Sequence, residues 1–304
     1  MRHADLARLL ALAALWGGSF MFMRVLAPHF GPALTADVRV TVGGLVLLAW
    51  MHLAGLRAEL SRYWRVYLWA GLLTSALPFF LYAFAAMSLP ASLTVIINAL
   101  SPMFGALFSA LWLGERLRRL QALGMLLGVA GVALIARPED FGVLGQSPLF
   151  WPAVLASIGA AMSYGLAGVY VRKHAASTPP NAVAAWSQLF ASLQLTPLLL
   201  VLPPPPPAGW AGITLQLAAI GLLFGLLCNA LAYLFYFRLI RDLGPTRALT
   251  VTFLMPAFGV LWAVLLLGES LTPGMASGGA IILLGTWLVL RRGQGVEASD
   301  HSRS

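Results

Sequence analysis

Charged residues are scarce in this chain of 304 amino acids. Only 10% of the residues are Asp, Glu, Lys or Arg, whereas 60% are hydrophobic, and the mean hydropathy is +0.86. An average soluble domain carries about 25% charged residues. Because a chain of this length cannot hide so much apolar surface from water, the composition excludes a soluble globular protein and predicts a protein embedded in a lipid bilayer.

Residues that mark common catalytic and metal sites are also few. Cys228 is the only cysteine, which excludes an internal disulfide, and its apolar neighbours predict a packing role. The sequence contains no Walker A loop and no HExxH, CxxC or GxSxG motif, and its five histidines are scattered over the termini and the ends of apolar runs. We therefore predict no metal, no cofactor and no enzymatic activity, with a membrane-embedded enzyme as an open alternative.

Ten apolar runs account for most of the chain. Each has roughly 20 residues, the length at which an α-helix crosses the hydrocarbon core of a bilayer. We predict an all-α polytopic membrane protein with ten transmembrane helices, joined mostly by short connections. The predicted spans are 6–27, 33–54, 65–87, 91–113, 119–136, 149–171, 181–202, 214–237, 246–268 and 273–290.

The basic residues are distributed unevenly between the two sides that these spans define. If the N-terminus is cytoplasmic, 16 of the 19 Lys and Arg residues lie in cytoplasmic segments, and only Arg24, Arg39 and Arg137 lie outside. This bias follows the positive-inside rule and predicts that both termini are cytoplasmic. The net charge of +9 therefore reflects membrane orientation, and we predict no nucleic-acid partner. Lys173 is the only lysine, which indicates a GC-rich bacterial genome, so the expected location is the bacterial inner membrane.

The chain contains an internal repeat. Residues 98–117, NALSPMFGALFSALWLGERL, align without a gap to residues 252–271, TFLMPAFGVLWAVLLLGESL, at an offset of 154. The repeat divides the chain into halves 1–145 and 146–292 with five spans each, followed by a polar tail, 293–304, that we predict to be disordered. An odd number of spans places the second half upside down relative to the first, which predicts an inverted repeat.

Three features together resemble a known transporter family. They are the LWGGSF sequence of the first span, a repeated P-x-x-G followed eight or nine residues later by Gly-Glu, and ten spans in two halves. This combination is similar to the EamA branch of the drug/metabolite transporter superfamily, within which aromatic amino-acid exporters of the YddG type come nearest. The resemblance implies a basket-like ten-helix bundle with a central cavity lined by both halves.

Polar and aromatic side chains inside the spans are the candidate substrate-binding residues, because an unsatisfied polar group in hydrocarbon is costly. The repeat aligns Phe79 with Tyr233 and Asn98 with Thr252. Aromatic faces combined with two amides suit an amphipathic molecule with an apolar or aromatic body. For any single member, an inter-helix packing contact or hydrogen bond is the alternative. The candidate set is Trp16, Phe79, Tyr82, Asn98, Tyr164, Asn229, Tyr233 and Thr252.

Proline and glutamate stand at structurally sensitive positions. Pro78, Pro102 and Pro256 lie inside spans, where the missing backbone hydrogen bond kinks a helix. We expect these prolines either to shape static bends or to act as hinges of a gate. Glu115 and Glu269 each follow a glycine at a membrane boundary. They are expected to anchor helix ends, with a gating salt bridge as the alternative.

No ionisable residue is predicted near the middle of any span. Asp37 and Arg39 stand one turn inside the outer end of span 33–54, where they either rim the outer mouth or snorkel toward water. Without a deep carboxylate, tight proton coupling is disfavoured. Without deep cations, a phosphorylated substrate is disfavoured as well, so a neutral, zwitterionic or cation–π-bound solute fits better.

These observations predict a secondary transporter that exports small metabolites, in particular amino acids and among them aromatic ones, by alternating access. An exporter of cationic or lipophilic drug-like compounds is the alternative. The ten spans suffice to form a cavity without a partner subunit, so we expect a monomer. Its expected partners are the lipid bilayer and a small-molecule substrate.

Overall fold

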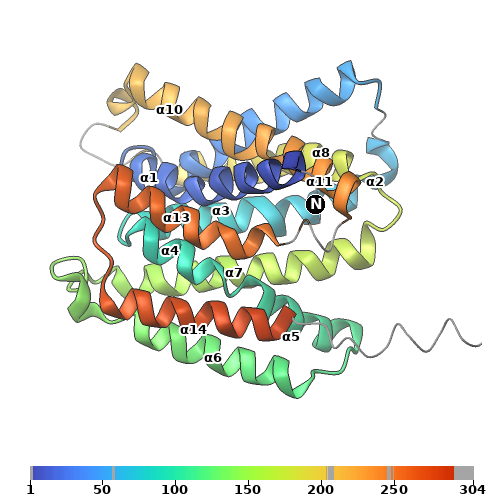
Figure 1. Ribbon diagram of the computed structural model, residues 1–304. Helices are drawn as coiled ribbons and strands as arrows, with labels where there is room; N and C mark the ends of the chain where they lie inside the picture. Colours follow the sequence, from blue (N-terminus) through green and yellow to red (C-terminus); the bar gives the residue numbers. More distant parts are fainter. Residues whose placement is uncertain are drawn as a thin grey trace, which may run out of the picture.

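The fold is a bundle of helices that lie side by side. Within the described residues the chain forms helices and turns and contains no strand. The connecting loops gather at two opposite ends of the bundle (Figure 1). The tail 293–304, predicted to be disordered, lies outside the described residues. The computed structural model describes residues 3–56, 59–202, 204, 209–244, 248 and 250–290.

Short irregular segments connect several of the helices. Two π-helical segments, η1 (Leu72–Ala76) and η4 (Leu226–Leu231), join α2 to α3 and α10 to α11, and 3₁₀ turns cover Pro138–Phe141 and Gly209–Gly212. The α-helices of the described residues are α1 (His3–Leu53), α2 (Leu60–Gly71), α3 (Leu77–Ala86), α4 (Ala91–Asn98), α5 (Ser101–Leu113), α6 (Arg119–Ile135), α7 (Phe150–His174), α8 (Pro180–Leu195), α9 (Leu198–Val201), α10 (Leu215–Gly225), α11 (Ala232–Leu243), α13 (Val251–Leu267) and α14 (Pro273–Leu290).

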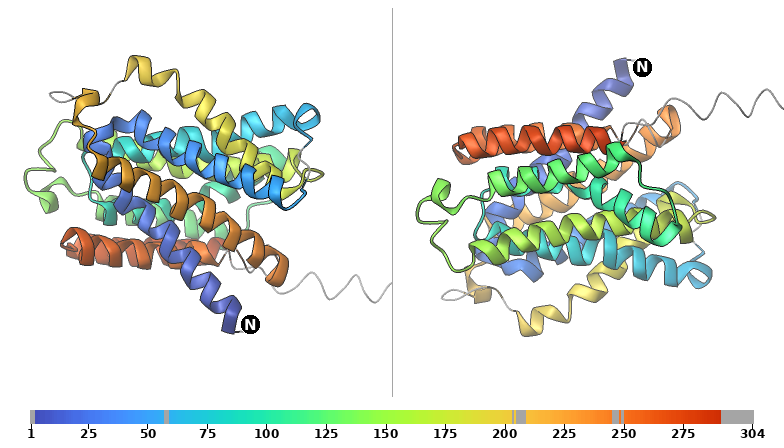
Figure 2. Two further views of the ribbon diagram at one scale, coloured as in Figure 1. Left: turned by 90° about the horizontal axis from the view of Figure 1, so that it is seen from above. Right: turned by 90° about the horizontal axis from the view of Figure 1, so that it is seen from below.

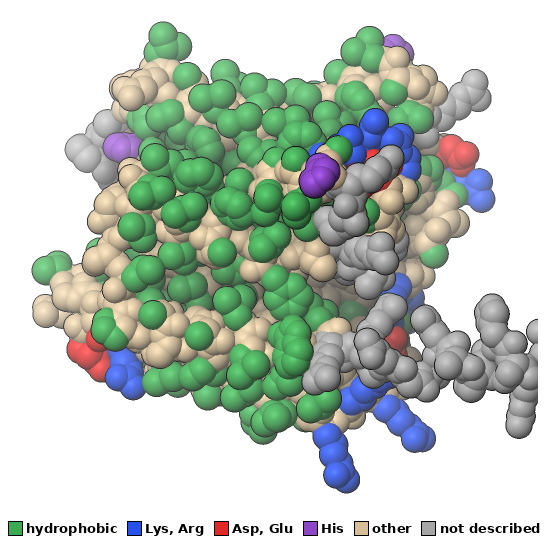
Figure 3. All heavy atoms as spheres, viewed as in Figure 1, with side chains coloured by type: hydrophobic (Ala, Val, Ile, Leu, Met, Phe, Trp, Pro, Cys, Tyr) green, Lys and Arg blue, Asp and Glu red, His purple; other side chains and the backbone are tan. Residues whose placement is uncertain are grey.

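Most of these helices are long and apolar. Seven helical segments of the described chain are long and apolar enough to cross a membrane, and α6 and α13 are shorter apolar helices. Hydrophobic side chains cover the visible side of the bundle, whereas most of the Lys and Arg side chains on this face gather at one end (Figure 3). This distribution is that of a multi-pass membrane protein, because the apolar band faces lipid and the charged ends face water.

The connection between the first two predicted spans differs from the prediction. We expected a loop between residues 27 and 33, but α1 continues through this region as helix and is interrupted only at Gly31. Gly31 has φ 73° and ψ 168°, a conformation that a residue without a Cβ adopts readily. The chain turns back there, so that α1 consists of two legs, 3–30 and 32–53 (Figure 2).

The two π-helical segments occupy equivalent positions of the repeat. They begin at Leu72 and Leu226, which are 154 residues apart. Such segments break the regular hydrogen-bond ladder and re-aim nearby side chains. Pro78 has no N–H to donate, and the Ser163 hydroxyl of α7 donates instead to the carbonyl oxygen of Leu73, at 2.8 Å. Pro78 therefore contributes to an irregular turn that a neighbouring helix stabilises.

Helices α6 and α14 pack closely through matching glycines (Figure 2). The repeat aligns Gly124 with Gly278 and Gly131 with Gly285. A β-carbon built on Gly124 would lie 2.5 Å from the carbonyl oxygen of Gly285, and one on Gly131 would lie 2.8 Å from that of Gly278. The two helices are thus antiparallel. The contact of Gly124 with Gly285 and the contact of Gly131 with Gly278 are equivalent under the repeat, with α6 and α14 exchanged.

We expect Gly124→Ala to destabilise the fold, because the added methyl group forces two backbones apart and overpacking of this kind typically costs about 1–3 kcal/mol. Gly168→Ala in α7 is the matched control, since a β-carbon there meets no described heavy atom within 4 Å apart from its own chain neighbours and helix backbone. Thermal unfolding of both variants in detergent, followed by tryptophan fluorescence, measures the difference. Equal melting temperatures for the two variants would contradict the close contact.

Candidate substrate-binding site

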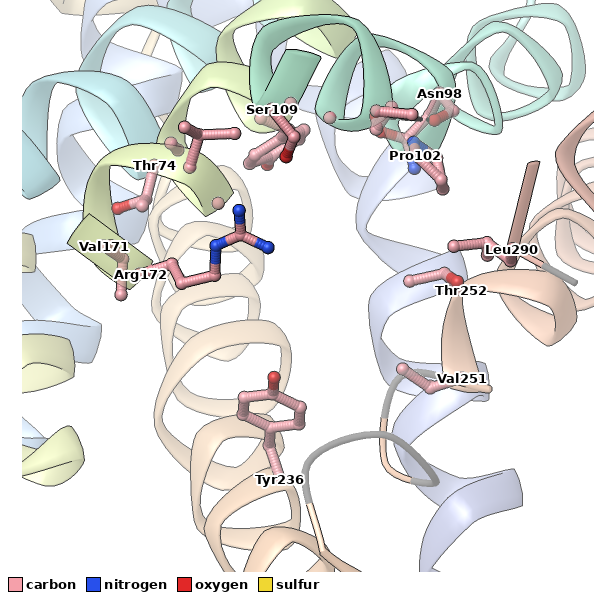
Figure 4. A pocket seen from close by; sticks show the side chains of 18 of the residues that line it. Thr74, Asn98, Pro102, Ser109, Val171, Arg172, Tyr236, Val251, Thr252 and Leu290 are labelled. Carbon is pink, nitrogen blue, oxygen red and sulfur yellow. Dashed lines mark hydrogen bonds between the residues drawn. The ribbon is translucent and has the colours of Figure 1, made fainter. Parts of the chain in front are cut away.

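A cavity of about 1260 Å³ extends from one end of the bundle into its interior. Among the described loop residues, 115–118, Ala175 and Thr178 line its mouth. Side chains from α5, α7, α11 and α13 surround the opening (Figure 4). Seven of the eight predicted substrate-binding residues line this cavity, namely Trp16, Phe79, Asn98, Tyr164, Asn229, Tyr233 and Thr252.

Tyr82, the eighth predicted residue, lies behind the cavity wall. Its side chain is only 1% exposed, and its hydroxyl donates a hydrogen bond of 2.8 Å to Oδ1 of Asn98. Its ring centroid lies 6.1 Å from that of Tyr164. Tyr82 therefore contacts two lining residues and does not itself line the cavity, so its direct contact with a substrate stays a prediction.

Aromatic rings form much of the wall. The ring centroid of Trp16 lies 5.3 Å from that of Tyr236 and 6.1 Å from that of Tyr233. The rings of Phe79 and Tyr164 are 6.4 Å apart. Tyr236 was absent from the predicted set although the repeat aligns it with a member of that set, and its hydroxyl points into the opening (Figure 4). Such a wall suits a ligand with an apolar or aromatic body.

The position of Arg39 corrects the sequence-based prediction. We expected this residue near the outer end of its span, either at the rim of the outer mouth or snorkelling toward water, but its side chain is only 5% exposed and lines the cavity. Arg39 lies about 12 Å along the second leg, and its side chain faces the interior of the bundle, a direction that hydropathy does not give. Its guanidinium carbon lies 3.7 Å from the ring centre of Phe79 and 5.0 Å from that of Phe224. An ionisable group is therefore buried inside the bundle.

Arg24 and Asp37, two further ionisable residues of α1, bind local partners. Nη1 of Arg24 donates to two carbonyl oxygens at the C-terminal end of α3, those of Ala86 and Met87, at 2.7 and 3.2 Å. Asp37 is half-buried and accepts a hydrogen bond of 3.3 Å from the hydroxyl of Thr41. Both residues therefore stabilise helices.

Asn229 connects three helical segments around the cavity. Its Oδ1 accepts a hydrogen bond of 2.8 Å from Nε of Arg39, and its Nδ2 donates to the carbonyl oxygen of Arg39 and to Oε1 of Gln188, both at 3.1 Å. Gln188 donates in turn to the hydroxyl of Tyr233 at 3.4 Å. These are inter-helix hydrogen bonds, the alternative that the sequence left open for Asn229. Gln188 was not predicted, although an amide inside span 181–202 was the signal that could have found it.

The sequence profile of the EamA-like transporter family matches residues 6–137 and, a second time, residues 151–291. The chain belongs to the EamA-like transporter family. This assignment agrees with the resemblance found in the sequence, whereas the narrower resemblance to exporters of the YddG type stays a prediction.

Several curated relatives of this EamA transporter cover nearly the whole chain. The uncharacterized transporter YvbV of Bacillus subtilis is 29% identical, over 95% of this chain and 92% of the relative. The uncharacterized inner membrane transporter YedA of Escherichia coli is 26% identical, over 87% of this chain and 83% of the relative. A probable amino-acid metabolite efflux pump of Salmonella typhimurium is 25% identical, over 92% of each protein.

A solved crystal structure of a protein with 21% sequence identity has the same fold. The superposition has a TM-score of 0.64 and covers 95% of this chain and 98% of the other. Together with the apolar helices, the relatives identify this EamA transporter as a multi-pass protein of the inner membrane that moves a small molecule.

Pro102 and Pro256 are equivalent in the sequence of the EamA transporter but differ in their local structure. The helix is interrupted between α4 and α5, immediately before Pro102, which lines the cavity. In contrast, α13 runs without a break past Pro256. The hydroxyl of Thr286 in α14 donates at 2.7 Å to the carbonyl oxygen of Ala99, inside the interruption. The two repeats therefore differ in conformation here, and the hinge role stays a prediction.

Apolar side chains fill the bundle beyond the inner part of the cavity. The rings of Phe22 and Phe224 stack with centroids 5.4 Å apart and an interplanar angle of 12°. Met23, Leu26 and Phe30 pack into the same cluster, close to the turn in α1. This packing closes the end of the EamA transporter that lies opposite the mouth.

Glu269 links the two halves at the closed end. Its carboxylate accepts hydrogen bonds from the backbone N–H groups of Ala91 and Ser92, at 2.7 and 3.0 Å, and from the hydroxyl of Ser92 at 2.5 Å. These residues begin α4, where free N–H groups and the helix dipole favour a carboxylate. At the open end Glu115 instead pairs with Arg172 at 2.7 Å, and both side chains are more than half exposed.

We expect Glu269→Gln to destabilise the protein far more than Glu115→Gln, its repeat-equivalent control. Hydrogen bonds to a charged group contribute about 1.5–3 kcal/mol, whereas an exposed ion pair contributes about 0–1 kcal/mol. The measurement is the melting temperature of each purified variant in detergent. A larger loss in Glu115→Gln would show that the link to α4 does not hold the closed end.

Proposed function

We propose that this protein exports amino acids, including aromatic ones, across the inner membrane as a secondary transporter that works by alternating access. The observation that carries the proposal is a cavity with aromatic walls and buried polar groups that reaches one end of the bundle. The Salmonella typhimurium relative, a probable amino-acid metabolite efflux pump by name, supports the substrate class. The two family matches support the transport role.

The proposed topology has ten transmembrane helices in two inverted repeats, 1–145 and 146–292. The exchanged glycine contacts between α6 and α14 support it, because a two-fold axis brings equivalent residues together in this reciprocal way. The helices before Gly114 and Gly268 also end alike, with these glycines at φ 71° and φ 67°. Such agreement across a 154-residue offset fits two copies of one unit.

The proposed orientation places the mouth and both chain ends in the cytoplasm. Arg116, Arg118 and Arg172 line the mouth, and cytoplasmic segments of membrane proteins are enriched in such residues. In this orientation the described conformation is open to the cytoplasm, the side from which an exporter takes its substrate. Opening to the other side would require the contacts of Glu269 with α4 to break.

An exporter of cationic or lipophilic drug-like compounds is the second candidate, since aromatic rings also bind cations. The buried positive charge of Arg39 in the same wall opposes a cationic ligand. The membrane-embedded enzyme has less support, because the family and the relatives described above are transporters. We therefore rank amino-acid export above the drug-exporter and enzyme alternatives. The expected assembly is a functional monomer.

The decisive experiment is counterflow of labelled amino acids in proteoliposomes that contain the purified protein. We expect selective uptake of a few aromatic or branched amino acids and no requirement for an imposed pH gradient. Empty liposomes provide the control for leakage. Equal uptake of all solutes in a broad panel would argue against carriage, and strict dependence on the gradient would argue against uncoupled transport.

We expect Tyr82→Phe to reduce flux about 2- to 10-fold without changing the yield of folded protein, because one hydrogen bond to Asn98 is lost. Tyr170→Phe is the matched control, since within the described residues the Tyr170 hydroxyl makes a single, exposed contact of 3.5 Å, with the carbonyl oxygen of Arg65. Initial rates of counterflow measure the effect. Unchanged flux in Tyr82→Phe would remove Tyr82 from the site.

A further inference from the structure

Arg39 is a buried cation with unused hydrogen-bonding capacity. Among the described residues its only hydrogen-bond partner as a side-chain donor is Oδ1 of Asn229, which binds Nε at 2.8 Å. None of the ion pairs within the described chain includes Arg39. Its terminal nitrogens, Nη1 and Nη2, are not among the fully buried polar atoms that lack a partner. They therefore remain in contact with the cavity that Arg39 lines.

The neutral neighbours of Arg39 do not balance its charge. The ring of Phe79 covers one face of the guanidinium at 3.7 Å, and such a cation–π contact offsets only part of the cost of burying a charge. Asn229 is a neutral amide. Charged side chains buried within membrane helices ordinarily pair with an opposite charge or mark a substrate pathway. The missing counter-charge is therefore expected from the ligand.

The other arginines that line the cavity, Arg116, Arg118 and Arg172, lie at its exposed mouth, and Arg24 of α1 does not line it. Nη1 of Arg24 donates to two carbonyl oxygens at the end of α3, which is a structural role. Arg172 at the mouth is half exposed and already pairs with Glu115. Of these arginines, Arg39 alone combines deep burial, contact with the cavity and terminal nitrogens without a partner in the described chain.

We infer that Arg39 binds the carboxylate of the transported molecule, so that the substrates are monocarboxylates with an apolar or aromatic body. The inference rests on the proposed transport function and narrows its substrate class. The planar guanidinium offers two parallel N–H groups that match a carboxylate. A phosphate group carries a charge of about −1.5 to −2, which one guanidinium would not balance.

The surroundings of Arg39 also place the rest of the ligand. Phe79 lies against the guanidinium and contacts the ring of Tyr164, so the aromatic wall begins beside the proposed carboxylate site. A molecule held there by its carboxylate would direct its body along that wall. Asn229, whose oxygen and nitrogen atoms are both engaged, acts as a positioning residue that holds Nε of Arg39.

The test measures binding in detergent separately from transport. The probes are L-phenylalanine and 3-phenylpropionate, which carry the carboxylate, and L-phenylalaninamide, which lacks it, with the quenching of tryptophan fluorescence as the readout. We expect the wild-type protein to bind at least one carboxylate about 10- to 100-fold more tightly than the amide. Arg39→Met should abolish this preference, and Arg39→Lys should restore only part of it because an ammonium lacks the planar fork.

Two further variants separate recognition from folding. Asn229→Asp places a carboxylate beside Nε at a nearly unchanged side-chain volume, so it should weaken binding of the carboxylate probes while Arg39 is still present. Arg172→Gln removes an arginine from the mouth and should leave the preference unchanged. Melting temperatures show whether each variant is folded.

Three results would overturn the inference. The wild-type protein could bind the amide as tightly as the carboxylates, or it could fail to bind either carboxylate. Folded Arg39→Met could also keep the preference for carboxylates over the amide. Counterflow measurements show whether the carboxylate inference or the transport proposal has failed. Amino-acid transport that is indifferent to Arg39→Met would refute the role of Arg39 and leave transport standing. If binding depends on Arg39 but no amino acid is transported, the role of Arg39 stands and the transport proposal is refuted.

Discussion

A polar group inside a bilayer finds no water, so every irregularity in these helices needs a partner from within the protein. In the π-helical segment η1, the carbonyl oxygen of Leu73 accepts a hydrogen bond from the hydroxyl of Ser163. At the interruption between α4 and α5, the carbonyl oxygen of Ala99 accepts a hydrogen bond from the hydroxyl of Thr286 in α14. At the end of α3, the carbonyl oxygen of Ala86 accepts one from Arg24. Places where single helices are weakest are therefore the places where neighbouring helices are tied together.

The same constraint accounts for the chemistry of the cavity. Asn229 satisfies its amide with Arg39 and Gln188, which leaves the terminal nitrogens of Arg39 in contact with the cavity. In bulk water these N–H groups would donate hydrogen bonds to water molecules. In a cavity bounded by aromatic rings they favour an anionic group, because electrostatic interactions strengthen as the local dielectric constant falls.

The two halves share a sequence pattern but differ where the cavity opens. Pro102 follows an interruption of the helix, whereas Pro256 lies within an unbroken one. Glu269 holds the start of α4, whereas Glu115 pairs with an exposed arginine. The proposed alternating-access mechanism requires such a difference between the two halves, since exchanging their conformations would move the opening to the other side.

Hydropathy and composition were sufficient to predict the long apolar helices. Seven of the eight candidate residues line one cavity, and their contact with a substrate stays a prediction. These predictions were possible because lipid requires long apolar helices and makes buried polar residues conspicuous. The depth of Arg39 could not be predicted in this way, because it depends on where α1 turns and on which helices surround it. The π-helical segments were missed as well, since one additional residue in a turn scarcely changes hydropathy.

The sequence by itself determined the membrane location, the helical architecture, the repeat and the family, because these follow from hydropathy, from the placement of arginine and from an alignment of the chain with itself. Only the tertiary structure decided which polar residues meet. It placed Tyr82 behind the wall, engaged Asn229 with its neighbours and left Arg39 facing the cavity. These outcomes depend on contacts between helices as far apart in the sequence as Arg39 and Asn229, and no local pattern records such contacts.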